Sequence, residues 1–141
     1  MLDGLCDLSD EAVVANVKEC VAGERRSTAR LLAFLAELDA RRLYLPEGHR
    51  SLFSYCVHYL HLSERAAYSR IEACRLARRF PIILDLISDS SVSLTAVAVL
   101  ARHLTEANHR SLLQEATYKT VGEVEEIVAR INPRTDVASN V

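Results

Sequence analysis

The residues of this chain best suited to chemistry gather in one stretch. The segment LHLSERAAYSRIEACRLARRFP, residues 60–81, holds five arginines within fifteen positions, shortly after a serine that follows an apolar run. An arginine guanidinium can bind phosphate through two parallel hydrogen bonds and can read the major-groove edge of guanine. The stretch therefore fits a helix that contacts DNA, and it also fits the solvated face of an all-helical scaffold.

The charge of the chain is unevenly distributed. Residues 41–79 hold eight arginines against three glutamates, a local charge of +5, and the remainder holds nine basic and sixteen acidic residues, a charge of −7. The net charge of −2 argues against indiscriminate binding of nucleic acid. A single basic segment is compatible with one docking face.

Residues 51–79 match the spacing of a helix-turn-helix. The first helix would pack inward, the turn falls at His61 and Leu62, and Ser63 is placed to cap the second helix. His61 stands where such turns favour glycine, because the backbone there usually has a positive φ. The residues expected to face inward on the first helix are Leu52, Phe53, Cys56, Val57 and Leu60.

The second helix separates into two faces on a wheel of 3.6 residues per turn. Ala67, Ile71 and Cys74 share the inward face. On the opposite arc we expect Arg65, Tyr68 and Ser69 to meet base edges, because the start of the second helix enters the major groove. Arg75 and Arg79, farther along, would bind phosphates, and Ser63 would both cap the helix and touch phosphate. Glu72 on this arc opposes the idea unless it accepts from a cytosine amine.

No catalytic or metal-binding pattern is visible in the sequence. His103 and His109 lie on either side of a helix boundary, and Cys56, His58 and His61 cannot all share one helical face. A Gly-rich phosphate loop, a dinucleotide fingerprint and a Ser-His-Asp pattern are also lacking. We therefore expect no catalytic residue, metal, cofactor or small-molecule substrate.

The elements that would position the arginine stretch are all helices, because only four glycines and three prolines interrupt the chain and no strand pattern stands out. The sequence predicts an all-α domain of about seven helices over residues 1–132, followed by a tail or linker over 133–141. It divides into a long helix (10–43), the helix-turn-helix (51–79) and a helical C-terminal part (81–132).

The long helix carries an apolar stripe with spacings of three and four residues. Ser9 is placed to cap it, and the stripe keeps its phase across Gly23, although two helices hinged at this glycine are the alternative. A helix of this length often pairs with a partner, so the stripe predicts a homodimer through residues 10–43. Its apolar members are Val14, Val17, Val21, Leu31, Leu35 and Leu38.

The sequence also bears on compartment. No run approaches 18 uncharged apolar residues, and the acidic N-terminus lacks the features of a signal peptide. The four cysteines, Cys6, Cys20, Cys56 and Cys74, form no CxxC pair, which is typical of free thiols in a reducing cytoplasm. These features predict a cytoplasmic protein without a membrane segment.

Residues from about 30 to 131 resemble the helical domain of unknown function that precedes the nuclease domain in bacterial HNH-endonuclease-type proteins. The stretches that carry the resemblance are LAELDARRLY (35–44), GHRSLFSYCVHYLHLSERAAYSRI (48–71), RLARRFP (75–81) and SLTAVAVLARHLT (93–105). Leu62 to Leu100 is also similar, more weakly, to the helix-turn-helix core of ParB-type partition proteins. Both resemblances imply double-stranded DNA as the partner. The turn glycine is absent, and the sequence ends at Val141, where the nuclease half would follow.

Two functions therefore remain. One is a DNA-binding module similar to the non-catalytic half of those endonucleases. The other is a helical dimerisation or adaptor domain whose arginines only keep the surface solvated.

Overall fold

The computed structural model describes residues 2–131, and this part of the chain is all-helical, as the sequence predicts. A 3₁₀ turn, η1 (Leu5–Asp7), precedes the helices, and a π-helical turn, η2 (Tyr55–Tyr59), follows the second of them. The expected tail, 133–141, lies outside the described residues. The seven helices are α1 (Asp10–Arg41), α2 (Leu52–Ser54), α3 (Glu64–Arg79), α4 (Ile82–Ser88), α5 (Leu94–Leu100), α6 (His109–Ala116) and α7 (Val121–Ile131).

The long helix α1 is continuous, so the alternative of a hinge at Gly23 is wrong. Ser9 caps its start as predicted, with the Ser9 hydroxyl oxygen accepting from the amide of Ala12 at 3.1 Å. The helix ends at Arg41, two residues before the predicted end, because Arg42 adopts a left-handed conformation with a φ of 53°. The amide of Arg42 still donates to the carbonyls of Leu38 and Asp39, which closes the last turn.

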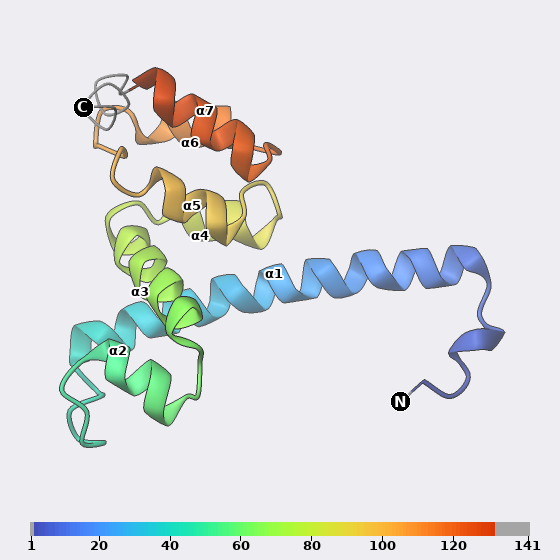
Figure 1. Ribbon diagram of the computed structural model, residues 1–141, viewed down its shortest axis with the longest axis horizontal. Helices are drawn as coiled ribbons and strands as arrows, with labels where there is room; N and C mark the ends of the chain where they lie inside the picture. The colour runs from blue at the N-terminus through green and yellow to red at the C-terminus, as the bar shows by residue number, and fades with distance from the viewer. Residues whose placement is uncertain (1, 132–141) are drawn as a thin grey trace, which may run out of the picture.

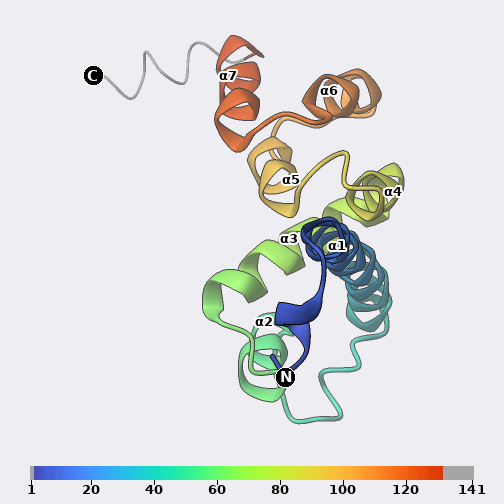
Figure 2. The same cartoon turned by 90° about the vertical axis from the view of Figure 1, so that its right-hand side faces the viewer.

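The helix α3 organises the body of the protein by crossing α1. Figure 1 shows α3 running across the C-terminal half of α1, with α2 on one side of α1 and α4 to α7 on the other. Along the axis of α1, Figure 2 shows α4 and α3 beside that helix and α5, α6 and α7 stacked beyond them. Contacts between α1 and both α3 and α4, and between α5 and both α3 and α7, join these parts.

One continuous hydrophobic core lies around this crossing and extends toward α7. Leu32 and Leu35 supply it from α1, and Phe80 supplies it from the junction between α3 and α4. Burying such side chains contributes roughly 1.5–3 kcal/mol each before conformational entropy is counted. The larger fully buried side chains are Phe80, Leu32, Leu52, Ile83, Ile87, Leu100, Leu113, Val97 and Val124.

The first half of the predicted helix-turn-helix, residues 51–60, departs from its prediction in detail. Leu52 and Cys56 are buried and Val57 is half-buried, but Phe53 and Leu60 are 39% and 38% exposed, so their predicted inward positions are wrong. The amide of Leu60 bonds to the carbonyl of Tyr55, five residues back, and such a π turn takes more residues per turn than an α-helix. The turn therefore rotates Leu60 away from the face that the 3.6-residue period assigns to it.

Two later helices are shorter than the sequence suggests. The apolar stretch LTAVAVLARHL, residues 94–104, is helical only as far as Leu100, and the next helix begins at His109, four residues after Thr105. Thr105 and Asn108 explain the gap, because each side chain accepts a hydrogen bond from the other residue's amide, at 3.1 and 2.7 Å. This reciprocal exchange orders a turn before α6. Thr120 and Glu123 form a capping box at the start of α7.

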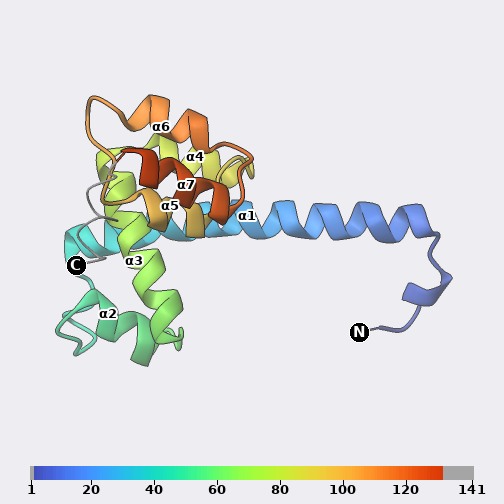
Figure 3. The same ribbon diagram turned by 45° about the horizontal axis from the view of Figure 1, so that its top comes forward.

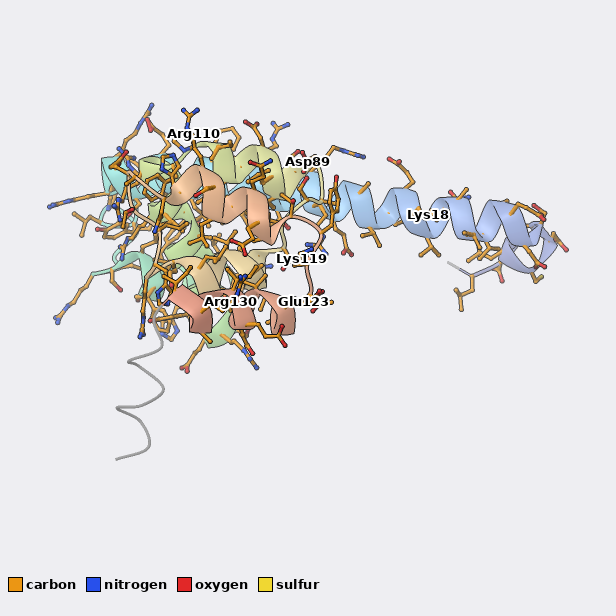
Figure 4. The ribbon with its side chains drawn as sticks, turned by 90° about the horizontal axis from the view of Figure 1, so that it is seen from above. Lys18, Asp89, Arg110, Lys119, Glu123 and Arg130 are labelled. Atoms are coloured by element: carbon orange, nitrogen blue, oxygen red, sulfur yellow. The ribbon has the colours of Figure 1, made fainter. Side chains whose placement is uncertain are left out.

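The N-terminal half of α1 projects from the body. Figures 1 and 3 show this half extending without a neighbouring helix, with the N-terminal segment folded back beside its far end. Lys18 stands on it in Figure 4, apart from Arg110 and Arg130 on the body. The buried residues of α1 are Ala29, Leu32 and Leu35, all in its second half. None of the helices of residues 2–131 is long and apolar enough to cross a membrane.

Candidate nucleic-acid interface

The turn before α3 contains a residue with a positive φ. His61 adopts a φ of 60°, as the spacing predicts for a position that favours glycine, so a histidine takes the left-handed conformation at some cost in strain. The amide of Leu62 bonds to the carbonyl of Cys56 at 3.0 Å, which ties the turn to the preceding segment. Ser63 then caps α3, its hydroxyl oxygen accepting from the amide of Ala66 at 3.1 Å.

The inward face of α3 is the predicted one. Ala67 and Cys74 are fully buried and Ile71 is 8% exposed, so these three residues fix the rotation of the helix about its axis. Burial raises the pKa of the Cys74 thiol to about 11, and burial also raises the pKa of the Cys56 thiol. Both thiols are therefore neutral and lie in the core at neutral pH.

The predicted DNA-facing residues are not equivalent in the structure. Arg65 and Arg79 are exposed, and Tyr68 is 64% exposed. The hydroxyls of Ser69 and Ser63 are already used within the helix. Ser69 is half-buried and its hydroxyl donates to the carbonyl of Arg65 at 3.0 Å, and the Ser63 hydroxyl caps the helix. Arg65, Tyr68 and Arg79 are thus the members of the set whose polar groups are presented outward.

Arg75 is instead attached to α1. Its Nε lies 3.1 Å from Oδ2 of Asp39 and its Nη2 lies 3.4 Å from Oδ1, a two-pronged ion pair between α3 and the last turns of α1. The hydrogen bond to Asp39 raises the pKa of Arg75 above its ordinary value. The neighbouring Arg78 donates to the carbonyl of Ala36 at 3.0 Å. Two of the five arginines therefore hold α3 against α1.

A groove runs along the outward side of α3 and ends beside the turn that follows α5. Its volume is about 430 Å³. The Arg79 guanidinium lies 4.8 Å from the Phe80 ring centroid, which orients it at one end. The lining residues are Tyr68, Ile71, Glu72, Arg75, Leu76, Arg79, Ala101 and Arg102.

Arg102 is the groove residue that sequence reasoning missed. It lies outside the basic segment 41–79 and follows α5, so only the packing of α5 against α3 brings it beside Arg75 and Arg79. No local pattern identifies it. Within residues 2–131, the guanidinium groups of Arg65, Arg79 and Arg102 make no ion pair or hydrogen bond with protein groups.

The positive charge of the groove is partly neutralised. Three guanidinium groups line it, and the carboxylate of Glu72 lies among them. Arg75 is already paired with Asp39, so Arg79 and Arg102 supply most of the available positive charge. The exposed Tyr68 ring at the other end offers a surface on which a sugar or base can stack.

The histidines noted in the sequence have structural surroundings. His109 stacks on Phe80 with ring centroids 4.4 Å apart, and its Nδ1 lies 3.0 and 3.1 Å from the carbonyls of Thr105 and Glu106. This nitrogen therefore carries a proton and donates, rather than ligating a metal. Over residues 2–131, no group of three His, Cys, Asp or Glu side chains is arranged to hold a metal ion.

Comparison with known proteins gives no match to a family model, a curated protein or a solved structure.

Proposed function

We propose that this protein is a DNA-binding module in which α3 enters the major groove of double-stranded DNA. The observation that carries the proposal is the combination of the positive-φ turn at His61, the Ser63 cap and an outward face that presents Arg65 and Tyr68. In a helix-turn-helix, the first turns of the second helix meet base edges. Arg65 is the residue at that position whose side chain can read guanine.

The groove beside α3 supports the same orientation. Arg79 lies fourteen residues beyond Arg65, about 21 Å along the helix at 1.5 Å per residue. With Arg102 beside it, this end of the face suits contacts to the phosphate backbone. Arg75 contributes less than the sequence suggests, because Asp39 already neutralises part of its charge.

The resemblance to the helical half of HNH-endonuclease-type proteins supports the same function. It rests on the stretches 35–44, 48–71, 75–81 and 93–105, which in the structure form the end of α1, the turn, α3 and α5.

The proposed function includes no catalytic activity. The purified protein should not cut DNA with magnesium, manganese or zinc, and cleavage that disappears in His103→Ala would contradict this.

Salt-dependent binding to duplex DNA tests the proposal. A target is first selected from a pool of random duplexes, and binding is then followed by fluorescence anisotropy across a salt series. Arg79→Ala and Arg102→Ala should weaken binding to all sequences and should each flatten the slope of log K against log salt by about one unit. Arg65→Ala should cost about 1–3 kcal/mol on the selected target and relax its sequence preference.

The matched control is Arg130→Ala, which removes an exposed arginine from α7, away from α3. It should leave the affinity and the salt slope unchanged. If Arg65→Ala and Arg79→Ala fold normally and bind as tightly as the unaltered protein at low salt, the arginines are a solvated face. That result would favour the alternative function, a helical dimerisation or adaptor domain with no nucleic-acid role.

A further inference from the structure

The projecting half of α1 carries an apolar surface that the rest of residues 2–131 leaves exposed. Val14 and Val17 are 52% and 58% exposed, and Val21 is 44% exposed. Leu5 and Leu8, from the folded-back segment, lie on the same side and with α1 form a groove of about 700 Å³. This is the same stripe whose later members, Leu31, Leu35 and Leu38, pack against the core.

Exposed valines on an isolated helix are unfavourable in two ways. Valine has a lower helix propensity than unbranched residues, and a helix without tertiary contacts gains little from its own hydrogen bonds. A contiguous apolar stripe of this kind on a projecting element is typical of an interaction surface. The occupant can be inferred from the charges beside the stripe.

We propose that two copies of this chain pair antiparallel through the projecting halves of α1. The stripe continues as a heptad seam in which Asp10, Glu24 and Thr28 occupy core positions together with the valines. In a parallel pair, Asp10 and Glu24 would each face their own counterparts, placing like charges in the seam. Parallel pairing of two copies is therefore disfavoured.

Antiparallel pairing removes both repulsions. With the seam centred on residue 19, Val17 faces Val21 of the second copy, Glu24 faces Val14 and Asp10 faces Thr28. The flanking positions then bring Glu11 beside Arg25 of the second copy, twice, once at each end. The acidic first turn, Asp10 and Glu11, thereby meets the basic end of the projecting half.

The length and strength of the proposed helix pair follow from the residues in its seam. Residues 10–28 span about 28 Å, which is about five turns of shared seam. Lys18 lies beside its own counterpart at the centre, and Cys20 lies beside its counterpart on the other edge. A short valine seam with a like-charge pair gives a micromolar, concentration-dependent dimer. The proposed pairing uses residues 10–28 of the predicted region 10–43, because the later members of the stripe, Leu31, Leu35 and Leu38, pack against the core of their own chain.

Sedimentation of the full chain over a concentration series tests the pairing. The mass should rise from the 15.7 kDa of one chain toward twice that value. Val17→Glu should keep the protein monomeric, whereas Ala15→Glu adds the same charge on the opposite, exposed face of α1 and should leave the dimer intact. Circular dichroism should show both variants folded, because neither side chain contributes to the core.

Charge reversal tests the direction. Glu11→Arg and Arg25→Glu should each weaken the dimer about tenfold, and the double variant should restore it. Within one chain these residues are about 21 Å apart, and they are equally far apart in a parallel pair, so rescue requires antiparallel pairing. A monomer at every concentration, or a dimer without rescue, overturns the proposal. The pairing does not depend on DNA binding, so either proposal can fail alone.

Discussion

The ion pair between Arg75 and Asp39 makes the sharpest prediction about stability. It joins α3 to the end of α1 through two N–O contacts of 3.1 and 3.4 Å. The Asp39 side chain is only 17% exposed, but the Arg75 side chain is 59% exposed, so water screens one side of the pair. Exposed pairs contribute about 0.2–1 kcal/mol, and two-pronged geometry with a half-buried carboxylate places this pair near the upper end, at about 1 kcal/mol.

A double-mutant cycle isolates that contribution. Arg75→Ala should lower the free energy of unfolding by about 1–2 kcal/mol, because it leaves the half-buried Asp39 carboxylate without its partner. Asp39→Ala should cost about 1 kcal/mol or less, since the remaining guanidinium is mostly in water. Urea unfolding of the two single variants and the double variant gives the coupling energy directly. A coupling below about 0.3 kcal/mol, as expected for independent sites, would refute the reasoning.

The same variants connect stability to the proposed function. Asp39→Ala releases Arg75 beside the groove that contains Arg79 and Arg102. If the groove binds phosphate, this destabilised variant should bind DNA more tightly at low salt and with a salt slope steeper by up to about one unit. Asp39→Asn is the matched control, because it removes the charge but keeps a hydrogen-bond acceptor for Arg75.

Two further predictions concern the interior of the helix-turn-helix. Ala67→Glu should destabilise the protein by several kcal/mol, measured as a lower urea midpoint, because Ala67 is fully buried and an unpaired charge would be left between α3 and its neighbours. Burial raises the pKa of Cys74 from its ordinary value of 9.0 to about 11, so the folded state favours the neutral thiol, and stability should fall as the pH rises from about 9 to about 11. Cys74→Ala should lose this part of the pH dependence, and an unchanged urea midpoint profile in that variant would contradict the assignment.

The sequence predicts the helical class and the local signals of this fold well. Ser9, Ser63 and Ser93 each cap the helix that follows them, because a cap depends only on a serine placed before a helical segment. The positive φ at His61 could also be predicted, since the spacing of the turn requires it whatever residue stands there. These features are local, and residue types at fixed spacing determine them.

Features that depend on tertiary packing could not be predicted. The exposure of Leu60 follows from a π turn that no residue pattern identifies. The apolar stripe of α1 gives no sign of where the body begins to cover it. The stripe has the same period on both sides of Ala29, but only its second half meets α3 and α4.

The arginines of α3 show that the number of arginines in a sequence cluster can exceed the number that are available for binding. Arg75 and Arg78 donate hydrogen bonds to α1, and Arg70 donates to the carbonyl of Ala66 in its own helix. Of the five, only Arg65 and Arg79 make no hydrogen bond or ion pair within residues 2–131. Arg102, from beyond the cluster, takes a place in the groove. Of these six arginines, three present an outward guanidinium group: Arg65, Arg79 and Arg102. Because the salt dependence of DNA binding reports the number of phosphates neutralised, the measured slope should follow this smaller, structural set and not the five arginines of residues 65–79.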